Sequence, residues 1–547
     1  MILQQLVWNN EKMQHTTELY YHADAEIRVS DAGMQIPAGS RVQFDTYFNS
    51  FLAKNWNRYT NVKQIIVRCV LQGEGIVRLL GNKEDAVAEQ KFSGKQEVIF
   101  EQKIFESPYF YLEIEAEKES VLESGSIETD MAQQPVKLAL ATCTYNRKQD
   151  IKKNIELLKQ YNSAASTEEA VLEQIYVVDN ASNLTKEEIE GDRVCLIPNK
   201  NTGGAGGFTR GLQEALKKED VTHIILMDDD VHIEFEAFRR TKAFLSYIKE
   251  EYKENFLGGA MFRTDMPYVL HAAGEDWSDG HIRNVYKSTD MRKFPQVLAV
   301  SEPVETEQAY AAWWCCCIPR SHVEKRGYPM PFFLHCDDVE YGLRSGRPPM
   351  YLNGIAVWHE EFEDKRSSVV EYYDVRNRLI TNALYKKKGK KRDVICVLCE
   401  RFCATVLRYR YKDFSLSVKA VEDFLKGPDW LAKVDSEALH KTLSSYGYRW
   451  NEVQELPEEA DYPTGKKLSA ILKYFLPAKG RRVIRMGAPV SAYAGKKQVL
   501  LVEPKSGKGF TVRKSFRETM RCGGRLIVEV WKVLWGYRNI EKQWKKR

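Results

Sequence analysis

The sequence predicts an α/β protein in which a doubly wound central domain follows a β-sandwich and precedes a helical region. Three observations support this fold class. Short segments of alternating apolar and polar residues fill the N-terminal quarter, strand-like and helix-like segments alternate from Val136 onwards, and helix-like segments dominate after Leu384. A chain of 547 residues is also too long for a single hydrophobic core. The predicted domains are residues 1–135, 136–385 and 386–547.

Six alternating segments define the predicted N-terminal sandwich: EIRVS, RVQFDTYF, KQIIVRCVLQ, GIVRLLG, QEVIFEQKIF and YFYLEIEAE. Clusters of Gly, Asn and Ser separate them, as expected for strands joined by turns. Strands at this spacing are typical of a sandwich and not of βαβ units. The stretch ESGSIETDMAQQP, which ends at Pro135, is predicted to be the linker to the next domain.

Four apolar segments predict the parallel strands of the central domain: VKLALATCTY, QIYVVDN, RVCLIPN and THIILMDDD. The amphipathic stretch Gln149–Tyr161 and the helical stretch GFTRGLQEALKKE alternate with them, which predicts a doubly wound sheet. Ligands bind at the carboxyl ends of the strands in such sheets. Polar side chains follow all four strands and are expected to gather at one place: Thr144, Asn146, Arg147, Asp179, Asn180, Asn201, Asp228, Asp229 and Asp230.

The segment MDDDV places three carboxylates at the end of a buried strand. Such carboxylates repel one another unless a cation or hydrogen-bond donors compensate. Their hard oxygens suit Mg²⁺ or Mn²⁺. Because alternate side chains of an extended strand share a side, Asp228 and Asp230 are the predicted ligand pair, and Asp229 is expected to make another contact. An acidic loop or helix N-terminus is the alternative interpretation.

The glycine-rich segment NKNTGGAGGFTRG follows the third strand. Gly204 and the neighbouring glycines let the backbone approach a ligand closely, and the next helix offers free N–H groups. The glycine fingerprint of a dinucleotide-binding fold belongs in the first βα turn instead. The position of this glycine-rich segment after the third strand therefore argues against an oxidoreductase.

Two later segments carry further candidate residues. In PFFLHCDDVEYGLR, Asp337 and Asp338 are expected near the N-terminus of a helix, where either could be a proton acceptor or a plain N-cap. In AVWHEEF, His359 ends an apolar stretch, and its imidazole could complete a site that already holds two carboxylates. Taken alone, such a histidine is more often a packed core residue.

The composition of the chain predicts where the protein is located in the cell and what kind of partner it binds. The sequence has no run of 18 apolar residues and no recognisable signal peptide. Its eleven scattered cysteines, including adjacent Cys315, Cys316 and Cys317, are expected to be reduced. These observations predict a cytosolic protein. The last 84 residues hold 22 Lys and Arg against 4 Asp and Glu. This basic end predicts an anionic partner, either a membrane surface or a nucleic acid. No nucleic-acid-binding module is recognised, so the segment RLIVEVWKVLWGYRNIEKQWKKR is predicted to pack on the body or to lie in a membrane interface.

Nine segments identify a family resemblance: TCTYNR, VVDN, NTGGAGGFTRG, MDDDV, HAAGE, AWWCCCIP, FFLHCDDVEYGLR, AVWHE and YYDVRNRL. Together they resemble glycosyltransferase family 2, and within it the galactofuranosyltransferases that build bacterial cell-wall galactan. The motifs cover about Val136 to Ile380. The resemblance implies a GT-A core, the doubly wound mixed sheet of nucleotide-diphospho-sugar transferases, between an N-terminal β-sandwich and a helical, membrane-associating C-terminal region.

The resemblance also implies a reaction and its residues. It implies an inverting, metal-dependent transfer of galactofuranose from UDP-galactofuranose to a glycan acceptor on a polyprenyl lipid, at the inner face of the cell membrane. Asp338 matches the catalytic base, and the ligands of Mn²⁺ or Mg²⁺ match Asp228, Asp230 and His359. The residues that match nucleotide-sugar contacts are Thr144, Arg147, Asp179, Asn201, Gly204, Asp229 and Glu275. The residues that match the acceptor or sugar surface are Trp313, Trp314 and Asp337.

Two positions depart from the family pattern and leave alternatives open. The galactan polymerases of this family have a histidine at the position of Asp374 and a tryptophan at the position of Cys336. Arg376 and Arg378 are expected to meet phosphate or to pin the loop after His359. A rhamnosyltransferase that uses dTDP-rhamnose is the alternative enzyme, and a non-catalytic glycan-binding module is the alternative from another class. The sequence leaves the linkage, the acceptor length and a homo-oligomeric state open.

Overall fold

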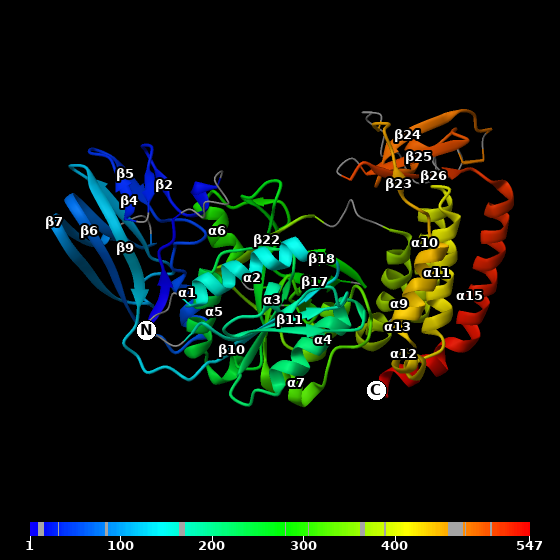
Figure 1. Cartoon of the computed structure of the whole chain (residues 1–547), viewed down its shortest axis with the longest axis horizontal. Helices are drawn as coiled ribbons and strands as arrows, with labels where there is room; N and C mark the ends of the chain where they lie inside the picture. Colours follow the sequence, from blue (N-terminus) through cyan, green and yellow to red (C-terminus); the bar gives the residue numbers. More distant parts are fainter. Residues whose placement is uncertain are drawn as a thin grey trace. The chain divides into compact units, whose positions relative to one another are not determined.

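The structure is a computed structural model that describes the whole chain except residues 9–15, 31, 83–85, 164–169, 279, 303, 305, 362–366, 388–389, 458–473, 476, 504–505 and 547. The chain forms two compact units (Figure 1). The first comprises Met1–Ser278, Ile282–Pro329 and Tyr341–Glu360, and the second comprises Asp279–His281, Met330–Glu340 and Glu361–Arg547. The predicted α/β fold class is confirmed, with an antiparallel sheet before a central mixed sheet and helices after it. The three domain boundaries stay a prediction.

The N-terminal strands belong to one antiparallel sheet that curls. Among the described residues, nine strands form it in the order β2-β5-β8-β6-β9-β4-β3, with β1 on β9 and β7 on β6. Their bounds are β1 Ile2–Gln5, β2 His22–Ala23, β3 Arg28–Ser30, β4 Gly33–Ile36, β5 Arg41–Gln43, β6 Gln64–Leu80, β7 Ala86–Lys103, β8 Tyr111–Ala116 and β9 Ser120–Glu128. Helix α1 (Ala53–Tyr59) interrupts the series.

Two predicted strands of this region, KQIIVRCVLQ and GIVRLLG, are one long strand, β6. Its first half pairs with β9 and its second half with β8, so the strand passes between the two parts of the curled sheet. Gly73 lies between the halves at φ 126°, where a Cβ would stand 2.2 Å from the Ser120 hydroxyl oxygen. The predicted linker is shorter than expected, because Glu123–Glu128 belongs to β9.

The central sheet has the order β12-β11-β10-β13-β21-β15-β16-β19, and β22 pairs with both β14 and β15. Strands β12, β11, β10 and β13 are parallel, as predicted, whereas β21 runs antiparallel to β13. The strand bounds of this sheet are β10 Leu138–Thr144, β11 Leu172–Asp179, β12 Val194–Pro198, β13 His223–Asp228, β14 His232–Ile233, β15 Leu257–Arg263, β16 Val269–Ala272, β19 Thr289–Asp290, β21 Cys315–Pro319 and β22 Met350–His359. A separate small sheet has the order β18-β17-β20, with bounds β17 Glu275–Ser278, β18 His281–Asn284 and β20 Ala309–Tyr310.

Helices alternate along the chain with the strands of this region. Their bounds are α2 Lys148–Ser163, α3 Lys186–Ile189, α4 Gly203–Leu216, α5 Glu236–Ser246, α6 Phe294–Val300, α7 Arg320–Arg326 and α8 Asp337–Ser345. Apolar side chains of α4, β10, β11, β13 and β21 share one core with Trp313 and Tyr341. All eleven cysteines are free thiols, and the trio at 315–317 is buried in β21, as expected.

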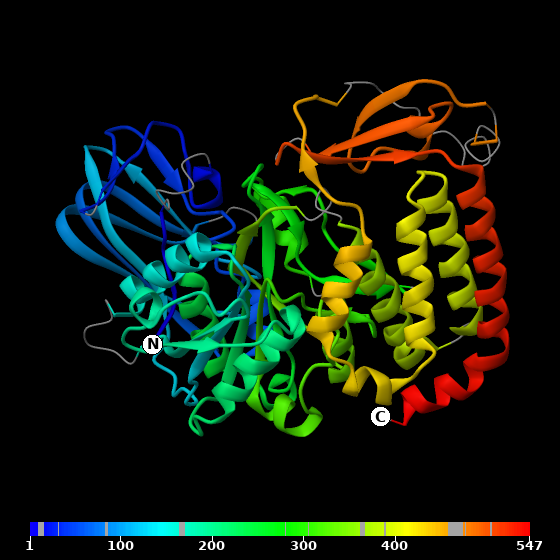
Figure 2. The ribbon, with the colours of Figure 1, turned by 45° about the vertical axis from the view of Figure 1, so that its right-hand side comes forward.

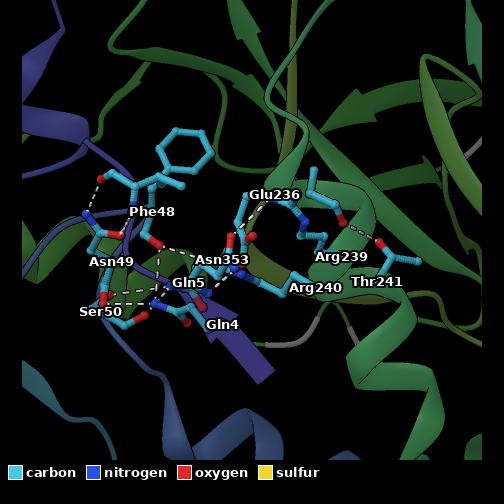
Figure 3. A network of polar contacts seen from close by, with 12 residues as sticks. Gln4, Gln5, Phe48, Asn49, Ser50, Glu236, Arg239, Arg240, Thr241 and Asn353 are labelled. Atoms are coloured by element: carbon cyan, nitrogen blue, oxygen red, sulfur yellow. Dashed lines mark hydrogen bonds and ion pairs between the residues drawn. The ribbon is translucent and has the colours of Figure 1, made fainter. Parts of the chain in front are cut away.

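A buried polar network joins the N-terminal region to helix α5 and to strand β22 of the central sheet (Figure 3). The Arg240 guanidinium on α5 donates to the carbonyl oxygens of Phe48, at 2.8 Å, and Asn353, at 2.9 Å. The Asn353 amide on β22 in turn donates to the carbonyl oxygens of Tyr47, at 3.1 Å, and Ser50, at 2.7 Å. Since β22 ends at His359, this network fixes the strand that presents the predicted metal ligand.

We expect Asn353→Ala to lower the free energy of unfolding by about 1–3 kcal/mol, because it leaves two buried carbonyl oxygens without their donor. Thermal unfolding followed by circular dichroism measures the change. Asn451→Ala is the matched control, because Asn451 is exposed in the small sheet described next. Equal melting temperatures for the two variants would contradict a structural role for the network.

The second unit contains the predicted helices and a small sheet (Figure 2). The helices are α9 Ser368–Tyr385, α10 Lys390–Val406, α11 Tyr411–Phe424, α12 Pro428–Lys433, α13 Ser436–Tyr446 and α15 Phe516–Lys545. The sheet, which the sequence interpretation missed, has the order β23-β26-β25-β24, with bounds β23 Asn451–Glu452, β24 Arg481–Arg485, β25 Gln498–Glu503 and β26 Lys508–Arg513. Among the described helices, none is long and apolar enough to cross a membrane.

Candidate functional site

Three residues from separate parts of the chain form an acidic cluster with one imidazole. Asp228 ends β13, Asp230 lies two residues later, and His359 ends β22. Strand β14 pairs with β22, with His232 opposite Trp358, and this pairing brings the turn after β13 beside the end of β22. One ligand atom from each residue lies within 4.8 Å of the other two.

The donor set of this cluster fits a hard divalent cation. The Nδ1 atom of His359 lies 2.6 Å from the Glu360 carbonyl oxygen, which can only accept a hydrogen bond, so Nδ1 carries the proton. The Nε2 atom lies 3.0 Å from Oδ1 of Asp230 and is therefore the ring nitrogen that faces the carboxylates. Two carboxylates and one imidazole are suitable ligands for Mn²⁺ or Mg²⁺. The predicted metal ligands are thus brought together, and their role stays a proposal.

Burial and mutual charge perturb these groups strongly. Burial raises the pKa of Asp228 to about 7, although the charge of His359 opposes the rise. Burial also acts to raise the pKa of Asp230, but its hydrogen bond with His359 and the charges of His359 and Arg147 lower it overall. Burial lowers the pKa of His359, yet Asp230 and Asp228 raise it overall. Half-buried carboxylates with such shifts are typical of a site that binds a cation.

Arg147 extends the cluster from the end of β10. Its Nη1 atom lies 3.1 Å from Oδ1 of Asp229 and also forms an ion pair with Asp230. Asp229 is buried, and burial raises its pKa to about 6 against the opposing charge of Arg147. Asp229 therefore shares Arg147 with Asp230, but it lies outside the group of three residues that could hold a metal. A nucleotide contact for Arg147 or Asp229 stays a prediction.

The other predicted nucleotide residues line the carboxyl ends of the parallel strands. Thr144 and Asp179 are opposite one another in the β10–β11 pair, and both are buried. The Asp179 carboxylate accepts hydrogen bonds from the backbone N–H groups of Ala181, Asn183 and Leu184 at 2.7–2.9 Å. These bonds fix the turn after β11. Asn201 accepts from the Gly203 N–H at 3.1 Å before α4, and the nucleotide contacts of all three residues stay predictions.

The glycines of NTGGAGGFTRG lie mostly within the first turns of α4, where they have two different surroundings. A Cβ on Gly207 would stand 1.9 Å from the Cys143 sulfur, and one on Gly211 would stand 2.6 Å from the Ala141 Cβ. These two glycines allow α4 to approach β10 closely. Among described atoms nothing lies within 4 Å of a Cβ on Gly204, so the predicted ligand approach is sterically open there.

The paired tryptophans are buried at the start of β21. Trp313 is 4% exposed and packs edge-on against Phe208 and Tyr341, and Trp314 is 7% exposed and donates its indole N–H to the Gly259 carbonyl oxygen at 2.8 Å. Both rings therefore have packing roles, and their predicted contact with a sugar stays a prediction. Glu275 is also buried, and its carboxylate accepts from the Tyr351 hydroxyl at 2.9 Å.

Asp337 and Asp338 belong to the second unit and begin α8, as expected. Burial raises the pKa of Asp337 to about 6, and the backbone N–H groups of the first turn oppose the rise. Asp338 is half-buried, and its Oδ1 accepts from the Val339 N–H at 2.7 Å. Arg376 donates to the Phe332 carbonyl oxygen at 2.7 Å, so it pins the segment before these aspartates. Its predicted contact with phosphate or with the loop after His359 stays a prediction, because residues 362–366 of that loop lie outside the described residues.

Asn154 on α2 was missed by the sequence interpretation. Its Nδ2 donates to the carbonyl oxygens of Asp229, at 3.0 Å, and Val231, at 2.9 Å. These bonds hold the backbone on either side of Asp230. The available sequence signal was weak: an asparagine inside an amphipathic helix, where this residue type is not favoured.

We expect Asn154→Ala to weaken Mn²⁺ binding about 10-fold or more, because the turn that orients Asp230 loses both of its side-chain donors. Titration calorimetry with Mn²⁺ measures the affinity. Asn162→Ala is the control, since Asn162 lies on the same helix and makes two buried hydrogen bonds with the Leu172 backbone, away from the cluster. Equal Mn²⁺ affinities in the two variants would contradict this role of Asn154.

The sequence comparisons with known proteins give galactofuranosyltransferases as relatives. Residues 6–130 match the family described as Galactofuranosyltransferase 2 N-terminal. Galactofuranosyltransferase GlfT2 of Mycobacterium tuberculosis is 28% identical over 478 residues, which cover 79% of this chain and 73% of that protein. The GlfT2 of Mycolicibacterium smegmatis is 28% identical over 464 residues, which cover 78% and 70%.

Among solved structures, the mannosyltransferase PcManGT of Pyrobaculum calidifontis, in complex with GDP-Man and Mn²⁺, is 14% identical. The match covers 58% of this chain and 87% of that one at a TM-score of 0.30, a value too low to support an argument. The sequence relatives and the matched N-terminal region instead carry the assignment: the chain is a galactofuranosyltransferase-like glycosyltransferase.

Proposed function

We propose that this enzyme transfers galactofuranose from UDP-galactofuranose to a lipid-linked glycan, with inversion at the anomeric carbon and with a divalent metal. The observation that carries the proposal is the Asp228–Asp230–His359 cluster in a chain whose relatives are galactofuranosyltransferases. A metal bound there would neutralise the developing charge of the leaving diphosphate. Arg147 adds a cation beside the same carboxylates and would bind the donor phosphates.

The acceptor hydroxyl must lose a proton as it attacks the anomeric carbon. We assign this step to Asp338, which matches the base in the family resemblance and begins α8. Single displacement by this route inverts the anomeric centre.

A donor comparison tests the proposal. The purified protein is incubated with Mn²⁺, a galactofuranose-terminated acceptor and, separately, UDP-galactofuranose, UDP-galactopyranose or dTDP-rhamnose. We expect nucleotide release and an extended glycan with UDP-galactofuranose only. Transfer from dTDP-rhamnose would instead identify a rhamnosyltransferase, and glycan binding without transfer from any donor would identify a binding module.

The same proposal includes an anionic membrane surface as partner, which fits a lipid-linked acceptor. One face of α15 is buried, through Cys522, Val533 and Tyr537, whereas the opposite face is apolar and exposed. The exposed apolar residues follow a helical stripe: Phe516, Met520, Ile527, Val528, Trp531, Leu534 and Trp535. Exposed basic residues flank this stripe: Arg517, Arg521, Lys532, Arg538, Lys542 and Lys545. An apolar stripe with basic flanks is typical of a helix that lies in an anionic membrane interface.

We expect the double variant Trp531→Ser, Trp535→Ser to lose binding to vesicles that contain anionic phospholipid. These indoles are 57% and 79% exposed, so their removal takes away most of the aromatic surface without opening a core. Vesicle flotation measures binding. Leu456→Ser is the control, because Leu456 is 83% exposed but lies outside α15. Flotation of the double variant at the level of the control would contradict the membrane contact.

A further inference from the structure

The segment before Asp337 has an unusually constrained backbone. Phe333, His335 and Cys336 have φ of 73°, 63° and 62°, in the left-handed region that residues other than glycine rarely adopt. Strain of this kind clusters at functional sites.

Side chains of α9 hold this backbone in place. The Asn377 amide donates to the carbonyl oxygens of Phe332, Leu334 and His335, at 3.2, 2.7 and 2.9 Å. Arg376 also donates to the Phe332 carbonyl oxygen. Both α9 side chains are buried. Two buried polar residues therefore hold this segment in its strained conformation.

The strained conformation presents an imidazole to solvent. The Nδ1 atom of His335 lies 2.5 Å from Oδ1 of Asp374 on α9, and 48% of the His335 side chain is exposed. The carboxylate oxygen accepts, so Nδ1 carries the proton and Nε2 points away from that bond. Within the described part of the chain, Nε2 makes no hydrogen bond. An oriented imidazole with one ring nitrogen available is a suitable ligand for a substrate hydroxyl or phosphate.

The surrounding charges discriminate between these two ligands. Partial desolvation of the ring lowers the pKa of His335, but the nearby carboxyl groups of Asp374, Asp337 and Asp338 raise it overall. Three carboxyl groups thus lie near one imidazole. Their negative charges would repel the diphosphate of a nucleotide sugar. A neutral, polyhydroxylated sugar has no such penalty, and carboxylates and imidazole together can both donate to and accept from neighbouring hydroxyl groups.

We propose that His335, oriented by Asp374, binds the acceptor sugar through its Nε2 atom, at a hydroxyl next to the one that Asp338 deprotonates. This inference rests on the proposed function, because it names the acceptor-binding residue of the same reaction. Asp374 is a positioning residue that acts through His335. The departure of position 374 from the family pattern then has a physical explanation: its carboxylate fixes the imidazole supplied by residue 335.

Steady-state kinetics of the full-length enzyme with Mn²⁺ and UDP-galactofuranose test this role, with an octyl glycoside of a galactofuranose disaccharide as acceptor. We expect His335→Ala to raise the acceptor KM about tenfold and to leave the donor KM within about twofold. Asp374→Asn should raise the acceptor KM about three- to fivefold. The double variant should behave like His335→Ala alone, because Asp374 acts only through the imidazole.

His281→Ala is the matched control, since His281 is also exposed and also bonded to an α9 side chain, Arg378, at 2.9 Å. An unchanged acceptor KM in His335→Ala, or equal rises in both KM values, would overturn the proposal. If His335→Ala melts well below the wild type, His335→Gln, which keeps a donor and an acceptor, should restore both folding and acceptor KM.

A binding measurement separates this inference from the proposed function. Calorimetric titration of the same disaccharide glycoside in the presence of UDP and Mn²⁺ needs no turnover. If His335→Ala weakens disaccharide binding about tenfold, the inference is supported, whether or not the wild type transfers sugar. An absence of transfer by the wild type would count against the proposed function alone. Equal binding to both proteins would overturn the inference even if transfer is normal.

Discussion

Asp338→Asn should lower kcat by about a thousandfold or more with little change in the affinity for UDP and Mn²⁺. An amide cannot accept the proton of the acceptor hydroxyl, and loss of a general base typically costs 10²- to 10⁴-fold. The substitution is nearly isosteric, and the amide oxygen can keep the hydrogen bond that Oδ1 accepts from the Val339 N–H. The expected defect is therefore chemical and not structural. Single-turnover transfer, together with calorimetric titration of UDP, separates the two.

Asp337→Asn is the control for this prediction. Asp337 is the adjacent carboxyl group, it is buried, and its pKa of about 6 also suits a proton acceptor near neutral pH. If Asp338 is the base, Asp337→Asn keeps most of the turnover while Asp338→Asn loses it. The reverse result would transfer the role of the base to Asp337. Substantial turnover in both single variants would exclude each of them as the sole base.

The sequence predicted the elements that follow from local pattern. Strands β10, β11, β12 and β13 are apolar runs that end in polar residues, and their parallel pairing places Thr144 opposite Asp179 and Cys143 opposite Asp228. Because parallel strands share one orientation, predicting the strands was enough to predict that these polar residues lie at one edge. The Asp228–Asp230–His359 cluster also depends on β22, and there the family resemblance supplied what periodicity alone did not.

Features that depend on distant contacts were not predictable in the same way. The fusion of two predicted strands into β6 depends on Gly73, whose φ of 126° continues the strand where a glycine usually ends one. The packing role of Gly207 appears only once Cys143 is placed beside it. The pairing of His335 with Asp374 joins residues 39 positions apart, and neither has a local pattern that indicates its partner.

Asp230→Asn should abolish specific Mn²⁺ binding and lower transfer by about a thousandfold. Asp230 is the carboxylate that contacts both His359, at 3.0 Å, and Arg147, so it is the shared group of the cluster. Its replacement removes one anionic ligand and the negative charge that faces both His359 and Arg147. Metal stabilisation of a leaving diphosphate contributes several kcal/mol, and about 4 kcal/mol corresponds to a thousandfold in rate. Electron paramagnetic resonance of Mn²⁺ measures binding directly.

Asp229→Asn provides the matched comparison, because Asp229 is the adjacent residue and also pairs with Arg147 but is not part of the three-residue cluster. Its Mn²⁺ affinity should stay within a few fold of the wild type, whereas donor binding should weaken. Chelation of the wild type should reproduce the loss of transfer seen in Asp230→Asn, and added Mn²⁺ should reverse it only in the wild type. Undiminished Mn²⁺ binding by Asp230→Asn would show that the cation is held elsewhere, and Asp228 and His359 would then lose their proposed role as ligands.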